Sequence, residues 1–256
     1  MAHDRAALVT QLREAGCVFA EEEAAILFAS ASDTPELELM VTRRIAGEPL
    51  EHVVGWAEFA GLRIPVEPGV FVPRRRTELV ARITQRLAPA SGTLVDLCCG
   101  AGAIGVAVAT WRDDLTVIAA DVDPVAVGLA RRALEPLGGT AVVSDMDAGL
   151  PAELKGVVDV VASCPPYVPT RQIALMPHEA RDHEPRKALD GGKDGARMQA
   201  RVFEAARRLL APGGVCVVET SDHVVDATVA AATRAGLAAA VEEDDVLGAV
   251  VVIGTP

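Results

Sequence analysis

The sequence has no long apolar segment, and this limits where the protein can work. Its longest largely apolar run, Ala101 to Trp111, is far shorter than the ~20 residues needed to span a bilayer. The chain begins Met1-Ala2-His3-Asp4, without an apolar stretch and a small-residue cleavage site of the kind that directs export. We therefore expect a cytoplasmic protein that does not enter a membrane.

Paired cysteines are also missing. The five cysteines are an odd number and contain no CxxC pair; they are Cys17, Cys98, Cys99, Cys164 and Cys216. This pattern argues against a disulfide framework and against a structural zinc site. We expect reduced thiols and no metal.

Basic charge is scarce. The chain has 24 Lys and Arg residues against 36 Asp and Glu residues, a net charge of −12, and its pI is near 4.9. A protein that binds a phosphate backbone usually presents a basic face, so direct binding of nucleic acid is disfavoured. The cluster Arg74 to Arg76 could still meet an anion, although a solvated loop is the more common role for such a run.

Residues 1–50 are expected to form a small helical N-terminal domain. From Arg5 to about Ala46, apolar residues recur at three- and four-residue spacing, which predicts three short helices. Thr34 before Pro35 is typical of a helix start, because the hydroxyl can cap free amides and proline fits the first turn. Residues 51–88 follow with glycines and prolines among Val, Phe and Ile, which indicates a β-hairpin linker region.

Residues 89–256 alternate apolar strands with amphipathic helices, the pattern of a parallel sheet covered on both faces. Seven strands are expected, at Thr93–Leu97, Thr116–Ala120, Thr140–Ser144, Val157–Ala162, Gly214–Thr220, Ala238–Glu242 and Ala249–Ile253. The clearest helices are expected at Ile104–Trp111, Pro124–Leu137, Ala196–Leu210 and Val224–Ala235. The fold class is therefore α/β, with a seven-stranded, doubly wound, Rossmann-like domain.

A glycine-rich turn follows the first strand of this domain. It runs from Asp96 through Gly100 and Gly102 to Gly105, where the helix begins. Glycines allow the backbone to turn tightly and to approach a ligand closely. At the end of the second strand, Asp121 is placed to accept both hydroxyls of a ribose. The two signals together predict a nucleotide-type cofactor.

The acid at position 96 favours S-adenosylmethionine (SAM) over a nicotinamide dinucleotide. A carboxylate just before the glycines suits the cationic amino group of SAM, whereas it would repel a pyrophosphate. No GKS or GKT phosphate loop is present. The product would be S-adenosylhomocysteine. The expected cofactor-binding residues are Asp96, Cys98, Gly100, Gly102, Asp121, Val122, Asp145, Met146 and Cys164.

The fourth strand ends in Cys164-Pro165-Pro166-Tyr167, at the edge where open α/β sheets bind ligands. Methyltransferases that act on planar amino groups have a similar element, with Asn or Asp before two prolines and an aromatic residue. Four blocks extend the likeness over most of the chain: the segment from Arg43 to Phe59, the segment from Pro68 to Leu79, the glycine turn, and the run from Pro165 to Gly195. In these blocks the chain resembles the HemK-type family, the protein-glutamine N5-methyltransferases of release factors, with relatives that act on a ribosomal protein.

The resemblance implies a class I methyltransferase domain and a protein substrate, a release factor or a ribosomal protein. In the family, an Asn side-chain oxygen and a backbone carbonyl of the following Pro hold the glutamine amide and aim its nitrogen at the sulfonium methyl. Catalysis is then mainly proximity and electrostatics. The implied catalytic residues are Cys164, Pro165, Pro166 and Tyr167, and the implied substrate-binding residues are Val72, Pro73, Arg74, Thr77, Glu78 and Tyr167.

The sequence departs from the family at three places that should face the acceptor. Cys164 replaces the Asn, and a thiol is only a weak hydrogen-bonding group; losing one preorganised hydrogen bond typically costs ~10²- to 10³-fold in rate. Arg75 and Arg76 stand where Pro and an acid are usual, and Thr220-Ser221 follow Glu219 where Ile-Gly is common.

Three hypotheses remain open at this point. The first is glutamine N5-methylation with compensation for Cys164, and the second is methylation of a small molecule or another non-amide nucleophile. The third is a SAM-binding module without turnover that docks on the translation machinery through residues 1–85. The sequence identifies neither the acceptor nor the oligomeric state.

Overall fold

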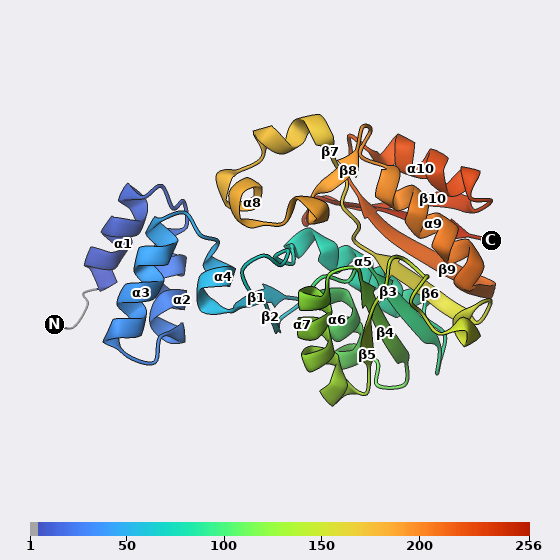
Figure 1. Ribbon diagram of the computed structural model, residues 1–256, viewed down its shortest axis with the longest axis horizontal. Helices are drawn as coiled ribbons and strands as arrows, with labels where there is room; N and C mark the ends of the chain where they lie inside the picture. Colours follow the sequence, from blue (N-terminus) through green and yellow to red (C-terminus); the bar gives the residue numbers. More distant parts are fainter. Residues whose placement is uncertain (1–4) are drawn as a thin grey trace.

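The computed structural model describes residues 5–256 and shows a small helical part beside a larger α/β part (Figure 1). The helical part contains α1 (Arg5–Glu14), α2 (Ala20–Ser30) and α3 (Thr34–Ile45), so the three expected helices are present. Their shared core includes Leu8, Leu12 and Leu27. None of the described helices is both long and apolar enough to cross a membrane.

The start of α3 differs from the expectation in one residue. Asp33, not Thr34, is the N-cap, and its carboxylate accepts the backbone N–H of Glu36 at 2.9 Å. An aspartate caps a free amide as well as a hydroxyl does, and Pro35 then lies in the first turn, as expected.

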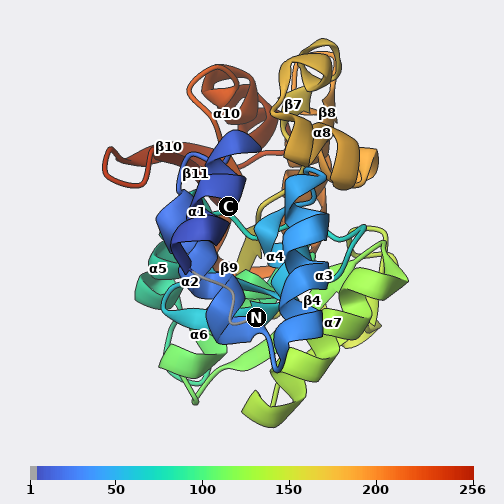
Figure 2. The ribbon, with the colours of Figure 1, turned by 90° about the vertical axis from the view of Figure 1, so that its left-hand side faces the viewer.

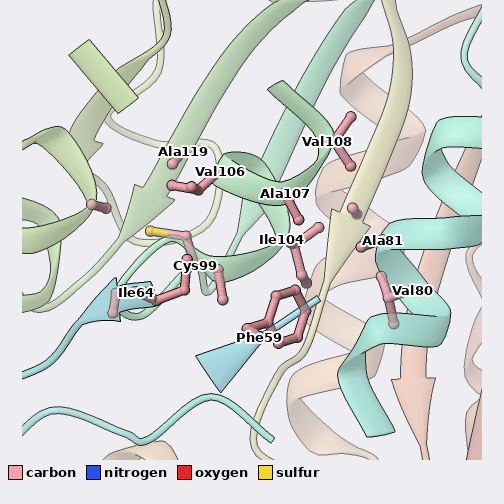
Figure 3. Packing of buried hydrophobic residues seen from close by; sticks show 14 of the residues in the cluster. Phe59, Ile64, Val80, Ala81, Cys99, Ile104, Val106, Ala107, Val108 and Ala119 are labelled. Atoms are coloured by element: carbon pink, nitrogen blue, oxygen red, sulfur yellow. The ribbon is translucent and has the colours of Figure 1, made fainter. Parts of the chain in front are cut away.

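The linker begins with the short helix α4 (Leu50–Val54) and continues into an antiparallel hairpin of β1 (Trp56–Phe59) and β2 (Leu62–Pro65). Its turn residues Ala60 and Gly61 both have positive φ angles, 54° and 75°, as a two-residue hairpin of type I′ requires. In Figure 3, Phe59 and Ile64 of the hairpin lie beside Ile104 and Cys99. The hairpin therefore belongs to the core under the glycine turn.

The rest of the linker is more helical than its glycine and proline content indicates. After the 3₁₀ turn η1 (Arg75–Thr77), α5 (Glu78–Leu87) buries Leu79, Val80 and Ile83. The spacing of these apolar residues is typical of an amphipathic helix. From the sequence, the segment is expected to belong to the linker, because a pattern of strands and turns precedes it. The division of the chain at residues 50 and 88 stays a prediction.

All seven expected strands are present in one sheet, in the order β10-β11-β9-β6-β3-β4-β5. Their bounds are β3 (Thr93–Leu97), β4 (Thr116–Asp121), β5 (Thr140–Val143), β6 (Val158–Ser163), β9 (Leu210–Thr220), β10 (Ala238–Asp244) and β11 (Ala249–Thr255). The first five are parallel, and β11 pairs antiparallel with both β9 and β10. The chain runs outward from β3 through β4 to β5, then crosses to β6, so the topological switch lies at β3, where doubly wound folds bind ligands.

Helices cover both faces of this sheet (Figure 1). One face carries α5, α6 (Ala103–Trp111) and α7 (Pro124–Leu134), and the other carries α9 (Arg197–Leu209) and α10 (Val225–Arg234). The expected helices are thus present, with α7 followed by the 3₁₀ turn η2 (Glu135–Leu137). This is the Rossmann-like architecture of class I methyltransferases, as the sequence predicts.

A long segment, residues 164–196, follows β6 and is here called the strap. It contains β7 (Val168–Pro169), η4 (Thr170–Leu175), α8 (His178–His183), η5 (Arg186–Ala188) and β8 (Asp190–Gly192). Figure 2 shows α8 near the end of α3, and the buried Arg44 of α3 forms an ion pair with Glu179 of α8 at 2.7 Å. The strap therefore connects the helical part to the α/β part.

Candidate active site

A cavity lies over the carboxyl ends of β3, β4, β5 and β6. The space within it is about 950 Å³, including space open to solvent. The expected residues that line it are Cys98, Gly100, Asp121, Val122, Asp145, Met146, Cys164, Pro166, Pro73 and Thr77. The topology thus brings the glycine turn and the diproline corner to one place.

The glycine turn has two glycines with different tasks. Gly100, with φ of 54°, lines the cavity, and a Cβ added there would meet nothing within 4 Å. A Cβ on Gly102 would lie 2.9 Å from the Cβ of Ala130 in α7. Gly102 is therefore required for close packing of α7 against the turn, and it does not line the cavity.

Asp121 joins the end of β4 to this turn. Its Oδ2 accepts the backbone N–H of Gly100 at 2.9 Å, and its Oδ1 accepts that of Asp123 at 2.9 Å. Burial raises the pKa of Asp121, and these two backbone hydrogen bonds oppose the rise. Each carboxylate oxygen keeps a further lone pair, so Asp121 could still accept the hydroxyls of a ribose in the cavity.

Asp96 is fully buried at the end of β3, beneath the turn. Its Oδ2 accepts the backbone N–H of Gly105 at 3.0 Å, whereas its Oδ1 has no hydrogen-bond partner. Burial raises the pKa of this carboxyl to about 7. Asp96 does not itself line the cavity, but its unpaired oxygen could be paired by a cation such as the amino group of SAM. Gly100 and Asp121, which do line the cavity, fit the rest of SAM.

Three expected cofactor residues follow β4 and β5. Val122, Asp145 and Met146 all line the cavity, and Met146 adopts a positive φ of 53°. Asp145 is exposed and forms an ion pair with Arg201 at 2.9 Å. Val122 and Met146 offer apolar surface for an adenine ring, and Asp145 offers a polar edge.

The diproline corner is held from two sides. Ser163 at the end of β6 donates to the carbonyl of Leu97 at 2.7 Å, and Tyr167 donates its hydroxyl to Oε1 of Glu219 at 2.9 Å. Thr77 donates to Sγ of Cys164 at 3.7 Å. Cys164 and Pro166 line the cavity, whereas Pro165 and Tyr167 are not among its lining residues.

The expected substrate residues have different surroundings. Glu184 of the strap accepts the backbone N–H of Val72 at 3.2 Å and the guanidinium of Arg74 at 2.6 Å, so these two residues anchor the strap. Pro73 and Thr77 line the cavity. Glu78 lies outside it and accepts hydrogen bonds from Ala60 and Arg82.

Sequence reasoning missed several residues that the fold brings to the cavity. Pro185, Lys187 and Ala188 of the strap line it, and Lys187 forms an ion pair with Asp123 at 3.1 Å. The fully buried Glu219 holds Tyr167. Their sequence signal was weak, because these contacts join residues far apart in the chain. Within residues 5–256, no group of three His, Cys, Asp or Glu side chains is arranged to hold a metal ion.

Comparison with known proteins gives consistent matches. The family model "Methyltransferase small domain" matches residues 61–182. A release factor glutamine methyltransferase of Mycolicibacterium smegmatis is 39% identical, over 78% of this chain and 71% of that protein. One from Bifidobacterium longum is 35% identical over 93% of both chains, and for one from Geobacter sulfurreducens, 36% identical, the match spans 63% of its length.

The fold is also found among solved structures. A methyltransferase from Pyrococcus furiosus superposes with a TM-score of 0.54 at 22% identity, over 76% of this chain and 89% of that one. The match supports the class I methyltransferase fold, and the sequence relatives provide the family. The chain therefore belongs to the HemK-type family of release factor glutamine methyltransferases and is a SAM-dependent methyltransferase.

Proposed function

We propose that this enzyme methylates the side-chain amide nitrogen of a glutamine in a release factor. The observation that supports this most is the position of the diproline corner. Cys164 and Pro166 line the same cavity as Gly100 and Asp121, so an acceptor at the corner would lie beside a methyl donor held by the glycine turn. The relatives at 35–39% identity are release factor glutamine methyltransferases.

The proposed cofactor site has separate residues for the amino group, the ribose and the adenine of SAM. Asp96 would attract the amino group, Gly100 would allow the backbone close to the ligand, and Asp121 would accept the ribose hydroxyls. Val122 and Met146 would contact the adenine. SAM supplies an electrophilic methyl on a sulfonium. The chain has to align a nucleophile with this methyl and exclude water.

The proposed acceptor site consists of Cys164, the backbone carbonyl of Pro165, and Tyr167. Pro165 and Pro166 stiffen the corner because each ring fixes its φ angle. Tyr167 is fixed by Glu219, and Pro73 and Thr77 also line the cavity. We place the enzyme in the cytoplasm, in accordance with its five free cysteines.

The test uses purified enzyme, labelled SAM and a purified release factor, followed by peptide mapping. The expected result is one added methyl group on a glutamine side chain. A Cys164→Asn variant should retain or increase this activity, because a carboxamide is a better hydrogen-bonding partner for an amide than a thiol is. A complete loss of activity in that variant would contradict the proposal.

A second candidate function is methylation of a non-amide nucleophile, and the thiol at position 164 favours it. A small or apolar acceptor would need no amide clamp beside Cys164. Labelling of a metabolite in a cell extract, while the release factor stays unmodified, would select this candidate.

A further inference from the structure

Glu219 is a buried acid beside the proposed acceptor site, where it has so far been assigned only the hydrogen bond to Tyr167. It lies at the end of β9, next to the diproline corner, and has no exposed surface. Its Oε1 accepts the hydroxyl of Tyr167 at 2.9 Å, while its Oε2 has no hydrogen-bond partner. A buried carboxyl with one unpaired oxygen costs stability, so a ligand that pairs this oxygen would offset the cost.

Glu219 does not itself line the cavity, but its neighbours Thr77 and Cys164 do. The Thr77 hydroxyl donates to the Cys164 sulfur at 3.7 Å. Burial raises the pKa of Glu219, and the hydrogen bond from Tyr167 and the charge of Arg76 oppose the rise. Burial, followed by the charge of Glu219, raises the pKa of the Cys164 thiol. We call Thr77, Cys164, Tyr167 and Glu219 the acceptor wall.

An amide substrate requires hydrogen-bond acceptors from the acceptor wall. Its nitrogen carries two N–H bonds, and both need acceptors when water is excluded. The backbone carbonyl of Pro165 can take one. The Cys164 sulfur is a weak acceptor and already receives the Thr77 hydroxyl. The carboxyl of Glu219 is a strong acceptor close enough to Cys164 for its charge to help raise the pKa of the thiol.

We propose that Glu219 accepts the second N–H of the substrate amide, in the role that a carboxamide oxygen at position 164 would otherwise fill. This inference rests on the proposed glutamine methylation. As the nitrogen–methyl bond forms, the sulfur–methyl bond breaks and its electron pair stays on sulfur, which becomes a neutral thioether. The nitrogen is then cationic and loses one proton to the carboxylate of Glu219, which later returns it to water. Atoms and charge balance without a further reactant.

The experiment is a double-mutant cycle on kcat with the release factor as substrate. Glu219→Gln keeps the size of the side chain but removes the negative charge and the proton acceptor. It should lower kcat by about 10²-fold and leave the SAM dissociation constant unchanged. Adding Cys164→Asn to Glu219→Gln should restore at least about tenfold of the loss, because the carboxamide then holds the amide. In the wild-type background, Cys164→Asn should have a much smaller effect.

A merely structural Glu219 would give another pattern. Cys164→Asn would then change kcat by the same factor in both backgrounds, since distant or independent effects add, and this result would overturn the assignment. A third variant, Glu219→Met, can accept neither the hydrogen bond nor the proton, and wild-type activity in it would overturn the assignment too. Unchanged SAM affinity shows that each variant is folded.

The two proposals fail in different ways. If the wild-type enzyme leaves the release factor unmodified, the proposed function and the role of Glu219 both fall. If the wild type is active but the cycle is additive, only the role of Glu219 falls.

Discussion

Asp121 accepts the backbone N–H of Gly100 at 2.9 Å, so the end of β4 is fastened to the glycine turn after β3. The other oxygen of Asp121 holds the backbone of Asp123 at 2.9 Å. One carboxylate therefore shapes the turn and also presents its remaining lone pairs to the cavity. A large substitution would disturb both tasks at once.

Asp121→Asn should weaken SAM binding by about 10- to 100-fold. The amide group presents N–H where the carboxylate accepts, so one backbone N–H loses its partner and a ribose hydroxyl loses its acceptor; a hydrogen bond to a charged group contributes ~1.5–3 kcal/mol. Isothermal titration calorimetry measures the dissociation constant. Asp113→Asn, at an exposed position before β4, is the matched control and should bind SAM normally. Equal affinities of the two variants would contradict the assigned role.

The pH dependence of SAM binding should report Asp96. Burial raises the pKa of its carboxyl to about 7, so in the free enzyme the group is neutral at lower pH and charged at higher pH. Only the charged form attracts the amino group of SAM. Affinity should therefore rise with pH through about 7, by at most tenfold per pH unit.

The same raised pKa has the opposite effect on the stability of the free enzyme. The contribution of Asp96 is complete below the pKa of the unfolded chain and is lost as the pH rises through about 7. SAM should thus raise the melting temperature more at about pH 8 than at about pH 6. Asp96→Asn should abolish the pH dependence of affinity, and a variant that keeps the wild-type profile would show that another group titrates.

Tyr167 is the only tyrosine of the chain, so near-ultraviolet absorbance follows its ionisation directly. Burial, followed by the charge of Glu219, raises the pKa of its hydroxyl above the ordinary value. The folded enzyme should show no phenolate at pH values where a free tyrosine, with a pKa of ~10, is half ionised. Glu219→Gln should lower the pKa of Tyr167. A normal titration in the wild type would mean that the Tyr167 hydroxyl is neither buried nor paired with Glu219.

Gly191 should not tolerate a side chain. A Cβ there would lie 2.5 Å from the carbonyl oxygen of Gly195 and 2.7 Å from the Cα of Tyr167, so the strap or the diproline corner must move. Gly191→Ala should lower kcat by more than about tenfold, since small misplacements of reacting groups are costly.

Gly128→Ala is the matched control for that substitution. Gly128 lies within α7, and an added Cβ would meet only the end of the Arg132 side chain, at 3.9 Å. This variant should keep full activity and gain about 0.5–1 kcal/mol of stability, because alanine is a better helix former than glycine. Thermal unfolding and steady-state rates measure both variants. Equal activity of the two would show that the contact near Tyr167 does not position the corner.

The strands and most helices of the α/β part could be predicted because their signals are local. An apolar run such as Val158–Ser163 is buried on both faces wherever its neighbours lie. The helix α5 escaped prediction because prolines and glycines upstream suggested continued turns. The cap at Asp33 was misplaced by one residue because neighbouring Asp33 and Thr34 are both good caps.

The sequence by itself determined the order of elements, the glycine turn after β3 and the diproline corner after β6, because spacing within a few tens of residues sets each of these. Only the tertiary structure decided which side chains meet at the cavity. Thr77 and Cys164 are 87 residues apart, and Tyr167 and Glu219 are 52 apart. The second contact follows from the sheet order, in which β6 and β9 are neighbours. That order is set by the burial of apolar faces over the whole domain, which no local pattern contains.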